Sequence, residues 1–131
     1  MIDRAIQHVY RLRMAVVFEF LLILVGALQW MYARLIDAPL STQTWGEMAL
    51  LLPLEAWAIA MMGGSLLTFL GLLYPPSPRL IMIGCTVQIA HMSFLGVSAM
   101  KTGGDPVVGA FAFGLLVPLH LFLMAKARYD Y

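Results

Sequence analysis

The chain has 131 residues, of which 62% are hydrophobic and only 11% are charged, and its formal net charge at pH 7 is +1. A water-soluble helical bundle needs a polar face on every helix, which this composition cannot supply. The small net charge provides no basic surface for nucleic acid. The single cysteine, Cys85, excludes an intrachain disulfide framework and a thiolate metal site. We therefore expect a single-domain membrane protein over residues 1–131.

The first thirteen residues mix apolar side chains with three arginines, Arg4, Arg11 and Arg13. A short segment of this kind is typical of an amphipathic helix that lies on a membrane surface. The alternative is an extension of the helix that follows.

Four apolar stretches make up most of the remaining chain, and each approaches the ~20 residues that a helix needs to cross the hydrocarbon layer. We place the spans at about residues 14–34, 53–73, 80–100 and 107–125. The connections between them are short, which favours antiparallel packing of consecutive helices. The predicted fold class is all-α: a polytopic membrane protein, built as an antiparallel four-transmembrane-helix bundle with a short N-terminal amphipathic segment.

The connections carry helix stop and start signals. Residues 37–39 (Asp-Ala-Pro) end the first span, and the hydroxyl and amide side chains of residues 41–44 are suited to cap a following helix. Residues 45–52 are expected to form an interfacial turn or two, kinked at Pro53. A Pro-rich segment at residues 74–78 and a turn at residues 101–106 form the other two connections.

Lys and Arg residues are distributed unequally between the two ends of the predicted bundle. Six lie on the side of both termini (Arg4, Arg11, Arg13, Arg79, Lys126 and Arg128), against Arg34 and Lys101 on the other side. The positive-inside rule then places both termini in the cytoplasm, here of a bacterial inner membrane.

Small and polar residues follow helical stripes on the first two spans. The stripe on the first span consists of Ala15, Glu19, Leu22, Gly26, Gln29 and Ala33. The second span carries a ladder of small residues at four-residue steps, which allows another helix to approach closely: Ala56, Ala60, Gly64 and Thr68.

The last two spans repeat this pattern. The third places Gly84, Gln88, His91, Leu95 and Ser98 on one face, and the fourth contributes Gly109, Gly114 and His120. We expect all four stripes to face one interior, with Gly26, Ala56, Ala60, Gly64, Thr68 and Gly84 as helix-packing positions. The polar interior candidates are Glu19, Gln29, Gln88, His91 and His120. The ordinary use of such residues is to hold helices together.

Glu19 and His120 lie at matching predicted depths, each ~8 Å inside the same end of the bundle. An ionisable residue within a span suggests a functional site, and it requires a partner. One hypothesis is a Glu19–His120 pair between the first and last helices. The alternative is that Glu19 reaches the interface or pairs with Arg13. Glu55, in the first turn of the second span, is expected only to complement the helix dipole.

His91 lies near the middle of the third span. A neighbouring Gln88, Ser98 or backbone carbonyl could satisfy it. No cofactor is predicted, but haem b bound through His91 is an alternative. His120 is a poor second axial ligand, because the predicted depths of ~17 Å and ~8 Å differ by about two turns.

One pattern over about two thirds of the chain suggests a family. A Trp45-Gly46 pair leads to Pro53 and Trp57, and is followed by Gly63-Gly64, Gly71-Leu-Leu73, a Gly-Asp-Pro turn and a basic end. The pattern resembles small four-helix integral membrane proteins of unknown function encoded by bacteriophages and bacteria. This resemblance implies the topology and no particular site.

The chain contains no phosphate-binding loop, nucleophile elbow or metal-binding His-Glu-x-x-His motif, so we predict no catalytic or metal-ligating residues. The leading hypothesis is a non-catalytic bundle protein: an oligomerising accessory or partner-binding subunit whose partners are the lipid bilayer, copies of itself or other membrane proteins. The second is a small channel or holin-like pore lined by Glu19, His91 and His120. The third is a redox subunit that binds haem or quinone.

Overall fold

The computed structural model describes residues 1–36, 48, 50–101 and 106–131. The helices in this part of the chain are α1 (Ile2–Arg11), α2 (Arg13–Ile36), α4 (Leu54–Leu72), α5 (Pro78–Lys101), α6 (Pro106–Phe111), the π-helix η1 (Ala112–Leu116) and α7 (Val117–Tyr129). The predicted stop and cap at residues 37–44, residues 45–47 and 49 of the following turn, and residues 102–105 of the last turn lie outside the described residues.

The N-terminal segment forms the helix that its sequence predicts. The side chains of Ile2, Ile6 and Tyr10 on α1 are exposed, whereas Leu12, the single residue between α1 and α2, is buried. The carbonyls of His8 and Tyr10 accept hydrogen bonds from the backbone at the end of α1. The chain therefore passes from α1 into α2 with little interruption.

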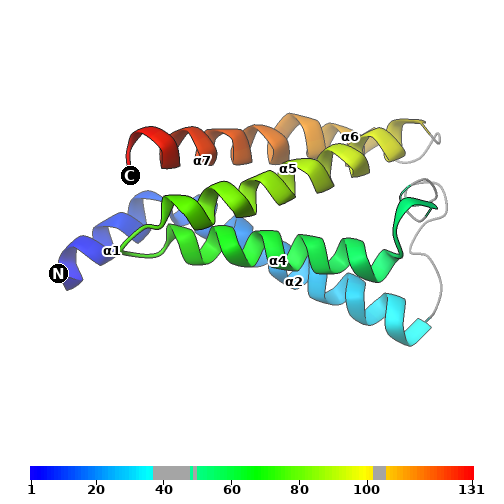
Figure 1. Cartoon of the computed structure of the whole chain (residues 1–131), viewed down its shortest axis with the longest axis horizontal. Coiled ribbons are helices and arrows are strands. Elements are labelled where there is room, and N and C mark those ends of the chain that lie inside the picture. Colours follow the sequence, from blue (N-terminus) through cyan, green and yellow to red (C-terminus); the bar gives the residue numbers. More distant parts are fainter. Residues whose placement is uncertain (37–47, 49, 102–105) are drawn as a thin grey trace.

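Four helical segments are long and apolar enough to cross a membrane: α2, α4, α5 and the continuous run of α6, η1 and α7. The fourth of these extends to Tyr129, beyond the predicted end at residue 125, so His120 lies nine residues before the end of its helix rather than about five. Figure 1 shows α1, the α4–α5 connection and the C-terminus at one end of the molecule. We call this the terminal end, and the opposite one the distal end.

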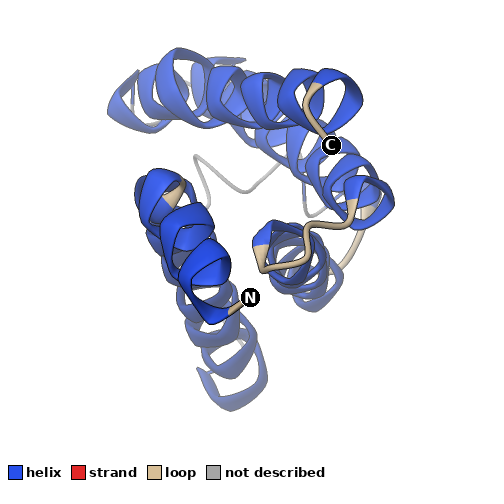
Figure 2. Ribbon diagram, turned by 90° about the vertical axis from the view of Figure 1, so that its left-hand side faces the viewer, coloured by secondary structure: helices blue, strands red, loops and turns tan. Residues whose placement is uncertain are grey.

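The helices pack in chain order. Extensive interfaces join α2 to α4, α4 to α5, and α5 to the run of α6, η1 and α7. No comparable interface joins α2 to α7 among the described residues. Figure 2 gives the end-on view of this arrangement, with both termini toward the viewer. The first and last helices therefore do not close the bundle by packing along each other.

Glycines allow the closest helix contacts. A Cβ atom on Gly84 of α5 would lie 2.6 Å from the carbonyl oxygen of Gly64 on α4, and one on Gly26 of α2 would lie 2.7 Å from Cγ of Met62. Side chains larger than hydrogen are excluded at these contacts unless the helices move apart. The predicted packing residues Gly26, Gly64 and Gly84 thus hold helices of the same chain together.

Other predicted packing positions lie at the margin of these interfaces. Ala56 and Ala60 are only partly buried, because α4 turns the face of Trp57, Met61 and Gly64 inward instead. A Cβ on Gly114 would meet nothing within 4 Å. Gly114 belongs to the π-helix, which the sequence pattern did not anticipate.

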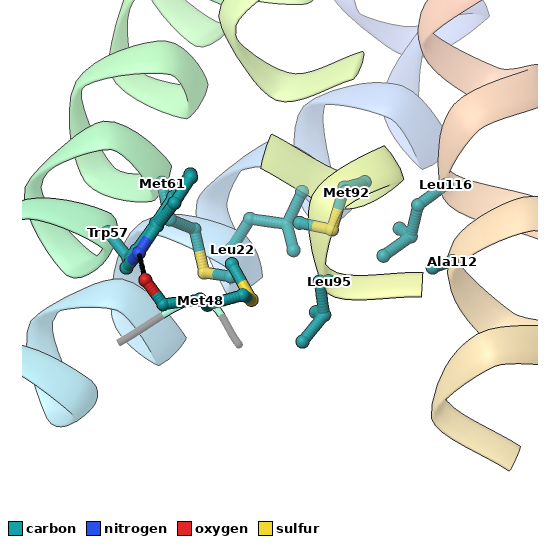
Figure 3. Packing of buried hydrophobic residues seen from close by; sticks show 8 residues of the cluster. All are labelled: Leu22, Met48, Trp57, Met61, Met92, Leu95, Ala112 and Leu116. Atoms are coloured by element: carbon teal, nitrogen blue, oxygen red, sulfur yellow. Dashed lines mark hydrogen bonds between the residues drawn. The ribbon is translucent and has the colours of Figure 1, made fainter. Parts of the chain in front are cut away.

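Two apolar clusters fill the interior. The terminal cluster contains Leu12, Ala15, Leu72, Ile81, Cys85, Leu123 and Ala127. The distal cluster contains Leu22, Met48, Trp57, Met61, Met92, Leu95, Ala112 and Leu116 (Figure 3). The indole of Trp57 donates a 2.8 Å hydrogen bond to the carbonyl of Met48, which holds the chain before α4 against the distal cluster.

Proline shapes the second and fourth helical segments differently. Pro53, with φ −56° and ψ 149°, is extended and precedes the first residue of α4, so it separates the preceding turn from the helix rather than kinking one continuous helix. Pro118 is the second residue of α7, two positions after the end of the π-helix. A proline ring clashes with the carbonyl four residues earlier in a regular α-helix, and the wider π-turn relieves this crowding.

Candidate functional site

A layer of buried polar side chains separates the two apolar clusters. On α2, Glu19 lies between Ala15 of the terminal cluster and Leu22 of the distal cluster, and on the last helix His120 lies between Leu123 and Leu116. The layer consists of Glu19, Ser65, Thr68, Gln88, His91 and His120, each at most 1% exposed. All four long helical segments contribute to this polar layer.

Glu19 and His120 meet across the gap between α2 and α7. Oε1 of Glu19 is 2.6 Å from Nε2 of His120, and both side chains are 0% exposed. The distance is short enough for an ion pair, but the two groups are not aligned as a well-formed hydrogen bond requires. Glu19 therefore neither reaches the interface nor pairs with Arg13, because its helix turns this face toward the interior.

The backbone of η1 fixes the tautomer of His120. Nδ1 of His120 is 2.6 Å from the carbonyl oxygen of Leu116. A carbonyl can only accept, so Nδ1 carries a hydrogen and donates it. Nε2 then either bears a lone pair or is the second N–H of an imidazolium. The Leu116 carbonyl is a contribution that sequence reasoning missed, since no residue type indicates it.

One proton must accompany the Glu19–His120 contact. Two atoms that both present lone pairs repel each other at 2.6 Å, so either the carboxyl group or Nε2 is protonated. The two arrangements are a carboxylic acid beside a neutral imidazole and a carboxylate beside an imidazolium. Both have zero net charge, which is the condition under which such a pair is tolerated without water.

Hydrogen bonds satisfy most of the polar layer on the α4–α5 side. Thr68 donates to the carbonyl of Gly64 at 2.9 Å. The amide nitrogen of Gln88 donates to the carbonyl of Met61 at 2.8 Å and contacts the hydroxyl of Ser65. Ser65 was not among the predicted candidates. Its position directly after Gly64 of the small-residue ladder is the only sequence signal that could have indicated it.

His91 packs against an aromatic ring rather than a hydrogen-bond partner. Its ring centroid lies 5.7 Å from that of Trp57, and the side chain is 1% exposed. Neither ring nitrogen has a hydrogen-bond partner in the described part of the chain. The partners expected from the sequence, Gln88 and Ser98, do not bond to it. Both nitrogens of His120 are engaged by Glu19 and Leu116, so His120 is not available as a second haem ligand.

The remaining predicted residues lie outside the layer. Gln29 is only partly buried, farther toward the distal end of α2. Glu55, in the first turn of α4, lies 3.5 Å from Arg34 in an exposed ion pair. No group of three or more His, Cys, Asp or Glu side chains that could hold a metal ion occurs among the described residues.

Several polar atoms of the layer lack a partner in the described structure: Oε2 of Glu19, Oε1 of Gln88, and Nδ1 and Nε2 of His91. A buried polar atom without a hydrogen bond is costly, by about 1–3 kcal/mol. Buried polar atoms without partners are the groups that bind buried water molecules, and a protonatable pair can exchange protons with such water.

No family model, curated protein or solved structure matches this chain.

Proposed function

We propose that the protein is a polytopic membrane protein, an antiparallel four-helix bundle, that moves protons through its interior by way of the Glu19–His120 pair. The observation that carries this proposal is the 2.6 Å contact between two ionisable side chains that are 0% exposed. Ionisable residues within spans are costly and mark proton relays or ion pathways in many membrane proteins.

The positions of the unsatisfied atoms support a path rather than a static bond. Gln88 and His91 lie one helical turn apart on the inward face of α5, and both present polar atoms without partners. Water molecules at these atoms would extend the hydrogen-bonded chain from the Glu19–His120 pair toward the distal end. The positive-inside distribution supports cytoplasmic termini, which would place the pair nearer to the cytoplasmic side.

The test is proton flux into liposomes that contain the purified protein and a trapped pH-sensitive dye. Under an imposed pH gradient and with a K⁺ ionophore to balance charge, the wild type should acidify the lumen faster than empty liposomes. Glu19→Gln and His120→Gln should each reduce the rate to the empty-liposome level, because neither amide can exchange a proton near neutral pH.

Glu55→Gln is the matched control, since it removes a carboxylate of similar size at an exposed position. Flux through Glu55→Gln should equal that of the wild type. Wild-type liposomes that stay as tight as empty ones, or undiminished flux through Glu19→Gln, would refute the proposal.

An accessory, partner-binding role is the second candidate, but it requires a surface other than the small-residue stripes, which pack within the chain. The observation that favours it is the small buried share of α2, 22% against 44% for α5. The apolar outer face of α2 is available to another membrane helix. Light scattering of the detergent-solubilised protein tests self-association, and a mass equal to one chain would exclude a homo-oligomer.

A further inference from the structure

A groove opens at the terminal end between the start of α5 and the end of α7. Its volume is about 570 Å³. Met82, Ile83 and Ala127 form apolar walls, and Arg79 and Arg128 contribute one guanidinium from each helix. Pro78 and Tyr131 complete the lining. The groove lies outside the polar layer and shares no residue with it.

The two arginines in this groove are not neutralised. Both are exposed, and neither forms an ion pair with a carboxylate of the described residues. Arg34 and Lys126, in contrast, pair with Glu55 and Asp130. Two unpaired positive charges at one groove therefore attract an anion.

The phenol of Tyr131 adds no negative charge to this site. Burial, the largest cause, raises the pKa of its hydroxyl above the usual value, so the group stays neutral at physiological pH. Its hydroxyl oxygen has no hydrogen-bond partner among the described residues.

The groove places its charged groups at the ends of the helices and its apolar surface farther along them. The headgroup and acyl chains of a phospholipid are arranged in the same order. Arg79 is the second residue of α5 and Arg128 the penultimate residue of α7, so both guanidiniums lie at the ends of segments long enough to span a membrane. The apolar walls continue from Arg79 to Met82 and Ile83, about one turn farther into the span. A free phosphate would use the charges and leave these walls empty.

We infer that this groove binds an anionic phospholipid, with the phosphate between Arg79 and Arg128 and an acyl chain along Met82 and Ile83. Basic pockets between spanning helices recognise lipid headgroups in this way. The inference does not depend on the proposed proton function.

A second groove at the same end provides an internal comparison. It is lined by Ala5, Ile6, Tyr10, Arg13, Leu73 and Tyr74. Its single guanidinium, that of Arg13, lies 4.6 Å from the centroid of the Tyr10 ring. Arg128 of the first groove also lies near an aromatic ring, 5.8 Å from the centroid of Tyr129, so the two grooves differ in the number of guanidiniums. With one guanidinium in place of two, the second groove should discriminate less between anionic and zwitterionic lipids.

Native mass spectrometry of the full chain in detergent, with phosphatidylglycerol or phosphatidylcholine added, tests the inference. The wild type should bind phosphatidylglycerol more tightly than phosphatidylcholine. Arg79→Gln/Arg128→Gln should weaken phosphatidylglycerol binding by about tenfold or more and leave phosphatidylcholine binding unchanged. Both arginines are exposed, so the double variant should fold, and its melting temperature verifies this.

Arg13→Gln/Arg34→Gln is the matched control and should retain wild-type binding of phosphatidylglycerol. Equal binding by the wild type and Arg79→Gln/Arg128→Gln, or equal affinity of the wild type for the two lipids, would overturn the inference. Displacement of phosphatidylglycerol by an equal concentration of inorganic phosphate would overturn it as well, because the groove would then be a phosphate site.

Discussion

The α4–α5 and α2–α7 sides of the bundle are built on different principles. Between α4 and α5 the backbones touch at Gly84 and Gly64, and the polar groups of Thr68 and Gln88 donate hydrogen bonds within the interface. Between α2 and α7 there is no comparable packing, and the two helices meet through Glu19 and His120. The first side holds the fold together by close contact, whereas the second joins two helices through a contact between protonatable side chains.

This difference indicates which side of the bundle contributes most to stability and which side carries the proposed proton chemistry. Replacing a buried ion pair with apolar residues is often neutral or stabilising, so such a pair is weak evidence for a stabilising role. Small residues at a helix contact, in contrast, contribute directly to packing. We therefore expect substitutions on the α4–α5 side to change stability. On the α2–α7 side, replacing both partners of the pair should abolish proton movement with little change in stability, whereas replacing one partner should also destabilise the fold.

The largest expected effect comes from removing one partner of the Glu19–His120 pair. His120→Leu leaves the carboxyl group of Glu19 buried without its partner, which should lower the free energy of unfolding by about 3 kcal/mol. Glu19→Leu/His120→Leu should recover stability to within about 1 kcal/mol of the wild type. Denaturant titration in mixed micelles measures both, and a double variant as unstable as His120→Leu would contradict the comparison.

The next effect concerns the glycine contact between α4 and α5. Gly84→Ala places a methyl group 2.6 Å from the carbonyl oxygen of Gly64, so the helices must separate, and we expect a loss of about 1–3 kcal/mol. Gly63→Ala is the control, because a Cβ there meets nothing within 4 Å and alanine favours the helix. Thermal melts in detergent report the difference, and equal melting temperatures for the two variants would show that this contact is not tight.

Hydropathy and helix periodicity account for the parts of the structure that sequence could predict. The four apolar stretches correspond to four long helices, and the inward face of Gly84, Gln88, His91, Leu95 and Ser98 on α5 is buried throughout. Matching depths along two helices also sufficed to suggest the Glu19–His120 pair. Each of these inferences depends only on the positions of residues along their own helices, not on how the helices are rotated or placed.

The features that sequence missed depend on how helices are rotated and placed. Ala60 follows the same four-residue steps as Gly64, yet only Gly64 is fully buried, because Trp57 and Met61 occupy the interior. Gly114 faces outward within a π-turn that no residue pattern indicated. The open α2–α7 side likewise follows from the packing of all four helices, so no single stripe reveals it.

A smaller loss of stability is expected at the distal end of α4, where Trp57 bonds to the chain that precedes the helix. Trp57→Phe removes the indole N–H that donates to the carbonyl of Met48 while retaining an aromatic ring beside His91. The loss of one buried hydrogen bond should cost about 1 kcal/mol. Trp30→Phe, at an exposed residue of α2, should be neutral in the same melts. A Trp57→Phe variant as stable as the wild type would show that this bond contributes nothing.

The smallest effect on global stability should come from α1. Nε2 of His8 lies 2.9 Å from the carbonyl oxygen of Leu72 at the end of α4, and the ring lies near those of Tyr74 and Tyr131. His8→Ala should change the free energy of unfolding by less than about 1 kcal/mol. It should nevertheless accelerate trypsin cleavage at Arg11 and Arg13 several-fold, whereas Gln7→Ala, at an exposed position, should not. Unchanged cleavage would show that His8 does not hold α1.

The most direct test of the central claim, that Glu19 and His120 share a proton, is ¹⁵N NMR of the histidine-labelled protein in lipid bilayers across a pH titration. Comparison with His8→Asn and His91→Asn variants assigns the His120 signals. We predict that Nδ1 of His120 remains protonated at every pH, while the Nε2 signal responds to Glu19→Gln and not to Glu55→Gln. A His120 ring that titrates like a histidine in water, with no response to Glu19→Gln, would contradict the account.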